Sequence, residues 1–215
     1  MQIAGNWRRR AVLAALVALG GAVTLLLVLS SKHTAATAAD HFPADKVTVA
    51  ANQAVVSGPG QAVTLLTGKL RTSTPADLQI AVTSECTIAT DVTTVGNDDQ
   101  SAEGLVKMWV EIDGKPVPVS STPKPDDGQI TFCNAAHHRK TSMFDDTNAT
   151  IETMDKYGDS NAFNWTALNV GNGIHTLTLK GELTETASNR ATADAAVGKR
   201  TMTVLPGHMA NDAAF

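Results

Sequence analysis

The sequence lacks the short motifs that identify the common classes of catalytic site. It contains no Gly-x-Ser-x-Gly nucleophile elbow, no His-Glu-x-x-His zinc motif, no Walker loop and no Rossmann glycine pattern. We therefore expect a protein that is not an enzyme. A Ser/His/Asp arrangement can still be drawn from six histidines and many carboxylates, so a hydrolase with a non-standard site stays open as an alternative.

Positive charge is scarce after the first forty residues. Four of the 17 Lys and Arg precede residue 40 and all 21 Asp and Glu lie at or after it, so the remainder has 13 basic and 21 acidic residues, a net charge of −8. A surface of this sign repels phosphate groups and anionic lipid. We expect no nucleic-acid partner, and membrane contact only through the N-terminal segment.

That N-terminal segment holds one long apolar run. Arg8, Arg9 and Arg10 precede nineteen uncharged residues, Ala11 to Leu29. This order is typical of an export signal, and basic residues stay on the cytoplasmic side, so residues 40–215 are expected outside the cytoplasm. The run is longer than a signal-peptide core of about 7–15 residues and nearly as long as a spanning helix of roughly 20. Ala36-Thr37-Ala38 offers a cleavage site, so an uncleaved anchor with its N-terminus inside and a secreted protein both remain open.

Cysteine is also rare, since Cys86 and Cys133 are the only two in the chain. An even count in an oxidising compartment predicts a disulfide between them. A metal site built on two thiolates would need more ligands at short spacing than the sequence offers.

Strand patterns dominate the rest of the chain. Apolar residues alternate with polar ones over residues 78–88 and again over 104–112, the period of a half-buried strand. Further strands are expected at residues 46–56, 61–70, 129–133 and 199–205, and a weak one near 150–154. Residues 134–148 are expected to form a solvated loop, and residues 186–196 a long loop or a short helix. About eight to ten short strands predict an all-β, two-sheet antiparallel β-sandwich, either immunoglobulin-like or jelly-roll.

Two turns predict hairpins. Asp113-Gly114 follows the strand at 104–112 and leads to Val117 and Val119. Gly171-Asn172-Gly173 separates a predicted strand at 163–170 from another at 174–183. Glycine adopts positive φ without steric strain and asparagine tolerates it, so these three residues can form a tight turn.

The two cysteines differ in parity. Cys86 alternates in phase with Ile80 and Val82, whereas Cys133 is out of phase with Ile130 and Phe132. Either a bulge precedes Cys133 or this cysteine lies past the end of its strand.

These patterns divide the chain into three parts. They predict a signal or anchor at 1–38, a linker with a possible first strand at 39–60, and the sandwich domain at 61–215.

Four stretches resemble secreted or cell-envelope bacterial β-sandwich proteins over about residues 60–210. They are Trp109 to Gly114, Phe132 to Asn134, Asn161 to Trp165 and Gly198 to Arg200. The resemblance implies a fold and a location and carries no activity. The stretch Gly173 to Leu179 is also similar to late strands of many immunoglobulin-like modules.

Histidines and carboxylates suggest one weak metal site. His137 and His138, with Asp145 and Asp146, could supply ligands to a divalent ion. Adjacent residues of a strand face opposite ways, so both histidines reach one ion only in a loop. The alternative is a solvated loop without metal.

A second weak signal concerns calcium, the one cofactor considered. Asp155, Asp159 and Asn161, together with Asp98 and Asp99, suggest oxygen-rich loops. The Asp-x-Asp-x-Asp-Gly pattern is missing, and ordinary acidic turns are the alternative.

Trp109 is the candidate binding residue. If Met108 and Val110 face the core, the indole lies outward between Lys107 and Glu111, where a large ring needs a partner surface. The alternatives are that another strand or loop covers Trp109, or that the faces are reversed. Trp165 is expected in the core, and His175 is expected to cap a sheet edge.

These features predict an extracytoplasmic, non-enzymatic β-sandwich module of the cell envelope, with a structural role or a binding role toward a protein, a glycan or a second copy. Its binding surface is expected at Trp109 and the loops at 134–148 and 155–161. A calcium-dependent binding domain and a non-standard hydrolase are the alternatives.

Overall fold

The computed structural model describes residues 43–119, 126–142 and 149–209, all in the second of the chain's two compact units, Pro43–Phe215. The predicted export segment at 1–38, with its cleavage site, lies outside these residues. No helix among the described residues is long and apolar enough to cross a membrane. They form two antiparallel sheets packed as a β-sandwich, so the predicted fold class is confirmed.

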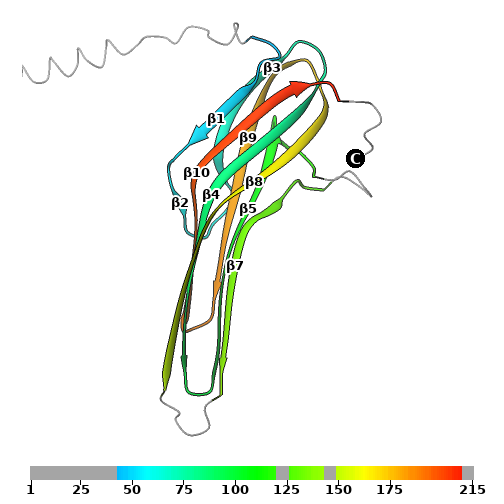
Figure 1. Ribbon diagram of the computed structural model, residues 1–215. Helices are drawn as coiled ribbons and strands as arrows, with labels where there is room; N and C mark the ends of the chain where they lie inside the picture. Colours follow the sequence, from blue (N-terminus) through cyan, green and yellow to red (C-terminus); the bar gives the residue numbers. More distant parts are fainter. Residues whose placement is uncertain (1–42, 120–125, 143–148, 210–215) are drawn as a thin grey trace, which may run out of the picture. The chain divides into compact units, whose positions relative to one another are not determined.

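Among the described residues each sheet contains five strands. Figure 1 shows their arrangement. The first has the order β1 (Thr48–Asn52), β10 (Ala191–Gly207), β4 (Ala76–Val95) and β8 (Thr150–Val170), with β2 (Val56–Ser57) also paired to β10. The second has the order β3 (Val63–Thr72), β9 (Gly173–Ala187), β5 (Asp98–Ile112) and β6 (Lys115–Pro116), with β7 (Ile130–Thr141) also paired to β5.

Strand β4 follows from its sequence most directly. Every second residue from Ala76 to Thr94 is buried, so the alternation continues without a break over 20 residues. At a rise of about 3.3 Å per residue the strand is about 65 Å long. This length explains the narrow arm in the lower half of Figure 1.

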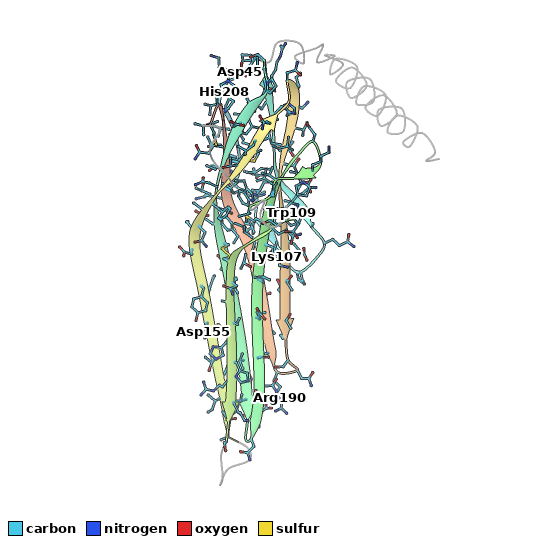
Figure 2. The ribbon with its side chains drawn as sticks, turned by 90° about the vertical axis from the view of Figure 1, so that its right-hand side faces the viewer. Asp45, Lys107, Trp109, Asp155, Arg190 and His208 are labelled. Carbon is cyan, nitrogen blue, oxygen red and sulfur yellow. A yellow bond between two sulfur atoms is a disulfide. The ribbon has the colours of Figure 1, made fainter. Side chains whose placement is uncertain are left out.

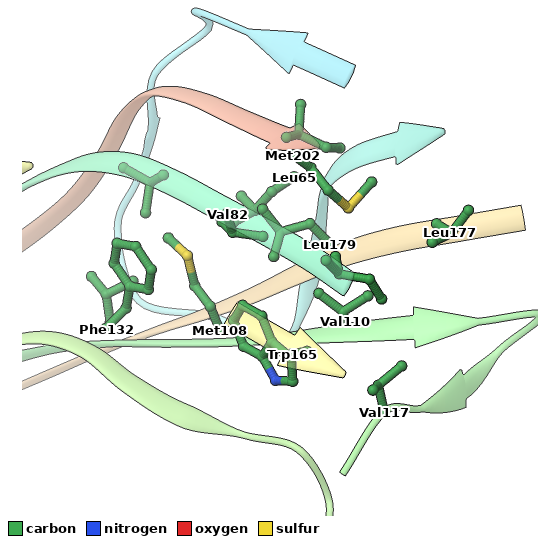
Figure 3. Packing of buried hydrophobic residues seen from close by; sticks show 14 of the residues in the cluster. Leu65, Val82, Met108, Val110, Val117, Phe132, Trp165, Leu177, Leu179 and Met202 are labelled. Atoms are coloured by element: carbon green, nitrogen blue, oxygen red, sulfur yellow. The ribbon is translucent and has the colours of Figure 1, made fainter. Parts of the chain in front are cut away.

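The large apolar core lies at the opposite end. It includes Met108, Trp165, Leu177, Leu179 and Met202, all fully or nearly fully buried between the sheets (Figure 3). The arm, residues 89–102, 136–141, 150–158 and 185–194, has a much smaller apolar cluster. That cluster holds Val92, Ala102 and Ala193.

The predicted disulfide is present and joins the two sheets. Cys86 on β4 is bonded to Cys133 on β7, with their Cα atoms 6.8 Å apart. The register of β5 with β7 moves from Val106 opposite Cys133 to Lys107 opposite Thr131, which leaves Phe132 as an extra residue. This bulge reverses the parity before Cys133, so the first of the two predicted explanations is confirmed.

The Asp113-Gly114 hairpin is confirmed, whereas the hairpin at Gly171-Asn172-Gly173 is wrong. Strand β8 pairs with β4, and β9 pairs with β3 and β5 in the other sheet. The glycine-rich segment is therefore a crossover between sheets. Turn chemistry permits the reversal of direction but does not decide which sheet the next strand joins.

Two predictions of loops are also wrong, and two predicted strands are present with different bounds. Residues 186–196 contain the end of β9, a turn and the start of β10, and residues 134–141 belong to β7. The weak strand near 150–154 is the beginning of the 21-residue β8. The expected first strand at 46–56 is divided into β1 and β2. In the arm the two sheets leave little room for large side chains between them. Small and polar residues therefore replace the apolar ones whose alternation would predict a strand.

A second bulge directs the side chain of Arg200 into the protein interior. The register of β10 with β4 shifts between Val197 and Arg200, and Arg200 is buried. Its Nε donates to the Leu65 carbonyl at 3.1 Å, and an Nη donates to the carbonyls of Ala54 at 2.8 Å and Gly198 at 2.7 Å. Burial lowers the pKa of the guanidinium. The bonds to backbone carbonyls tie β10 to β3 and to the segment before β2.

Candidate functional site

A candidate site for a ligand is a cleft at the end of the sandwich opposite the arm, here called the end cleft. It has a volume of about 910 Å³ and lies between the β5–β6 region of one sheet and the last residues of β8 in the other. Val117, Pro118 and Val119 line one wall, and Trp165 and Leu168 line the other. Mostly apolar walls with a few polar groups are typical of ligand sites.

The Trp165 indole anchors the apolar wall in the core. Its side chain is 1% exposed, and its N–H donates to the Gly128 carbonyl at 2.9 Å. The ring packs edge-on against Phe163, with centroids 4.7 Å apart. The prediction that Trp165 belongs to the core is confirmed, and Figure 3 shows it beside Met108 and Val110.

The polar rim of the end cleft is centred on His175. Its Nδ1 lies 2.7 Å from Asp113 Oδ2, and its Nε2 lies 2.9 Å from the Gly171 carbonyl oxygen. The Thr72 hydroxyl donates to the same carbonyl at 2.6 Å. His175 thus connects the β5–β6 turn, the end of β3 and the crossover from β8 to β9. Its expected place at a sheet edge is wrong, because β9 lies between β3 and β5.

Asp113 holds this rim through both carboxylate oxygens. The Asp113-Gly114 turn has positive φ at both residues, 51° and 77°, as a two-residue hairpin requires. Asp113 Oδ1 accepts the backbone N–H of Thr176 at 2.8 Å, and Oδ2 contacts His175. The Thr176 N–H, followed by the His175 contact, lowers the pKa of the Asp113 carboxyl below its ordinary value.

We expect Asp113→Asn to destabilise the fold at neutral pH and to have less effect in acid. A carboxylate whose pKa is lower in the folded chain stabilises above its unfolded pKa of about 3.9, and this contribution is lost as the pH falls through the folded value. At pH 7 the loss should be about 1 kcal/mol, because half of the side chain is exposed and water screens the contacts. Thermal melts of both proteins should converge once the pH falls below the lowered pKa of Asp113.

The control for this prediction is Asp194→Asn, which neutralises an exposed carboxylate on β10. It should leave the wild-type pH profile unchanged. A constant difference between Asp113→Asn and wild type from pH 2.5 to 8 would contradict a stabilising role for the Asp113 charge.

The same rim resembles a triad, but its geometry does not favour nucleophilic catalysis. Thr72 Oγ1 is 3.4 Å from His175 Nε2, a long contact, while its proton is directed to the Gly171 carbonyl. Thr72 is also buried and does not line the end cleft. A nucleophile needs a base within hydrogen-bond reach and access to the substrate, and Thr72 has neither.

Trp109 does not form the expected exposed platform. It lies on the outward face of β5, as its parity predicts, but only 7% of it is exposed. Its N–H donates to Glu111 Oε1 at 3.1 Å, and Lys180 of β9 lies opposite in the register. Lys107 is half-buried on the same face (Figure 2). The alternative that the surrounding protein covers the ring is the correct one.

The histidines do not converge on a metal ion. His137 Nδ1 contacts Asp155 Oδ2 at 2.7 Å, whereas His138 Nε2 contacts Asp99 Oδ1 at 2.5 Å. Both lie on strand β7, so they face opposite ways, and the loop that the metal hypothesis needs is absent. Their proposed partners Asp145 and Asp146 fall outside the described residues. In the described part of the chain, no group of three or more His, Cys, Asp or Glu is placed to hold a metal.

The residues considered for calcium are likewise on a strand. Asp155 contacts His137, Asp159 accepts the N–H of Ser160 at 2.7 Å, and Asn161 donates to the Phe132 carbonyl at 3.1 Å. They are spread along β8 instead of forming a loop, so the expected oxygen-rich cage is wrong. Asp98 and Asp99 are engaged separately. Their partners are Gln100 and Arg190 for Asp98, and His138 for Asp99.

Comparisons with known proteins assign no family. No family model and no curated protein matches the chain. A structure of the infectious bursal disease virus Gx strain is 12% identical with a TM-score of 0.25, and the VP2 subviral particle of that virus is 13% identical with a TM-score of 0.28. The alignments cover 78% and 77% of this chain but only 37% of each viral chain. Parasporin-2 of Bacillus thuringiensis is 10% identical with a TM-score of 0.16, over 75% of this chain and 68% of the toxin. Similarities this low carry no functional argument.

Proposed function

We propose that the chain is an extracytoplasmic, non-enzymatic binding module of the cell envelope that holds a segment of a partner protein in the end cleft. The observation that carries the proposal is the cleft itself, with apolar walls and a polar rim at His175 and Asp113. The disulfide supports an oxidising location. Residues 1–38 would deliver the module, either as a cleaved signal or as an anchor.

The lining favours polypeptide over glycan as the ligand. Val119 and Leu168 are partly exposed apolar side chains, one on each wall. An apolar ligand group that covers them gains binding free energy because apolar surface is removed from water. Trp165, the aromatic residue of the lining, is buried and offers no open ring face for a sugar. The few polar groups at the rim would orient the bound segment. An uncharged, Val-, Leu- and Pro-rich stretch suits these walls.

The test is a thermal-shift screen of the full chain in mild detergent against synthetic uncharged peptides rich in Val, Leu and Pro, with cell-wall glycan fragments in parallel. We expect peptides, but not glycans, to raise the melting temperature. A ligand at 100 times its Kd stabilises by about 2.7 kcal/mol. Leu168→Lys, at a residue that is 43% exposed, should abolish the shift because it replaces an apolar group of the wall with a charge.

Val49→Lys is the matched control, since Val49 is 63% exposed on β1 and does not line the end cleft. It should retain the peptide-induced shift. A shift that survives in Leu168→Lys would place the ligand elsewhere, and stabilisation by glycans alone would overturn the peptide assignment.

A further inference from the structure

Strand β8 has an open edge in the part of the sheet that the described residues form. Among the described residues it pairs with β4 alone, along almost its entire length. In Figure 1 its first half runs along the outer side of the arm, and Figure 2 marks Asp155 there. Such an edge presents backbone N–H and C=O groups that can pair with another strand. Proteins usually protect it with a cover, a proline or a bulge, and residues 150–158 have no proline.

The same nine residues also expose large apolar side chains. Met154 is 70% exposed and Tyr157 is 55% exposed, so two of the most exposed large apolar residues lie three positions apart on this edge, one on each face of the sheet. An apolar edge strand is a site for association with another strand. The remaining question is which strand.

We propose that β8 pairs antiparallel with β8 of a second copy, about a two-fold axis at Met154. In this register Met154 lies opposite Met154 of the second copy. Glu152 lies opposite Lys156 of the second copy, and the symmetry repeats this charge pair. Ile151 lies opposite Tyr157, an apolar pair that is also repeated. Opposite charges and apolar groups therefore meet in one register, and such cross-strand pairs stabilise sheets.

Neighbouring registers are less favourable. An axis at Asp155 or at Lys156 places that charge opposite itself, and an axis at Tyr157 places Asp155 opposite Asp159. Like charges directly opposite each other destabilise a sheet. Strand β7, the nearby edge of the other sheet, carries the consecutive basic residues His138, Arg139 and Lys140 and is less suited to pair with itself.

The edge is already ordered for pairing. Asp155 is fixed by His137 at 2.7 Å, and the Thr153 hydroxyl accepts from Arg139 Nη at 2.6 Å. Both contacts come from β7 in the facing sheet. These side chains of β8 therefore lose little conformational entropy when a second strand is added. Pairing would join the β1-β10-β4-β8 sheets of the two copies into one continuous sheet, with the two β8 strands at its centre. This association does not depend on the end cleft.

The first test is a cross-link in the full chain, in its own envelope or an equivalent bacterial host. We expect Met154→Cys to give a disulfide-linked dimer on non-reducing gels after mild oxidation, because the axis places the two side chains opposite each other. Val49→Cys, an exposed residue on a different edge strand, should stay monomeric on the same gel. A linked product from Val49→Cys in equal yield, linkage of Met154→Cys to another protein, or no linkage would each overturn the proposal.

The second test fixes the register by charge reversal in sedimentation equilibrium. Glu152→Lys and Lys156→Glu alone should each weaken the dimer by about tenfold, since each replaces two attractive pairs with two repulsive ones. The double variant Glu152→Lys/Lys156→Glu should restore wild-type association. A monomeric wild type, or a double variant as weak as the single ones, would contradict pairing at Met154.

Discussion

The double variant Cys86→Ala/Cys133→Ala should lose about 4 kcal/mol of unfolding free energy, because the bond closes a loop with a sequence separation of 47 residues in the unfolded chain. For a domain of this size, that loss corresponds to a fall of roughly 10 °C in melting temperature. Both cysteines lie at the junction of the core and the arm, and the bond joins the two sheets there. Chemical denaturation of wild type and variant measures the difference directly.

Reduction supplies an independent control. Wild-type protein melted with excess dithiothreitol should approach the double variant, while the double variant itself should not respond to the reductant. If wild type and variant unfold within about 1 kcal/mol of each other, the bond does not constrain the unfolded chain as the loop-closure model requires. Alkylation of intact cells should also find both thiols unreactive if the domain is exported.

The sequence predicted the parts of the fold that depend on local alternation. Strand β4 alternates without interruption, and the parity conflict at Cys133 correctly indicated a bulge. These features follow from the geometry of a single strand with one buried face. The fold class followed from the same local evidence, whereas the disulfide followed from the cysteine count and from the oxidising compartment that the export segment indicates.

The arm was not predicted because few large apolar residues lie between its two sheets. Its sheets lie so close that small side chains are needed between them. Next to the arm, a Cβ atom placed on Gly104 of β5 would lie only 2.5 Å from Cγ2 of Ile88, a main-core residue on the facing sheet. Ala193 of β10 is buried, yet alanine in an Asp- and Thr-rich stretch gives no strand signal.

The end cleft could not be predicted because it depends on how the two sheets meet. The Asp113-Gly114 turn was recognised, but its contact with His175 joins residues 62 positions apart. Leu168 lines the cleft because β8 belongs to the sheet that faces β6. The predicted hairpin at Gly171-Asn172-Gly173 would have put β8 and β9 side by side in one sheet. Parity places Trp109 on the outward face of its strand, and the cover over its ring is a tertiary feature.

Trp165→Ala is expected to be the most destabilising single substitution in the end cleft. Removing a fully buried indole costs about 3–5 kcal/mol through lost burial and the cavity left behind. The Gly128 carbonyl also loses its donor, and Gly128 lies so close to Val117 that a Cβ there would be 2.0 Å from the Val117 carbonyl oxygen. We therefore expect the 126–129 segment and the Val117 wall to loosen together, which denaturation and amide exchange would both detect.

Trp165→Phe separates the packing of the indole from its hydrogen bond. It keeps most of the ring volume and removes the N–H donor, so it should cost about 1 kcal/mol from the lost bond and somewhat more from the smaller ring. Leu205→Ala, at a partly exposed residue of β10, should change stability by no more than about 0.5 kcal/mol. If Trp165→Phe were as damaging as Trp165→Ala, the bond to Gly128 would dominate over packing. If Trp165→Ala cost less than about 1 kcal/mol, the ring would not be the anchor of the cleft wall, and the proposed ligand site would lose its rigid support.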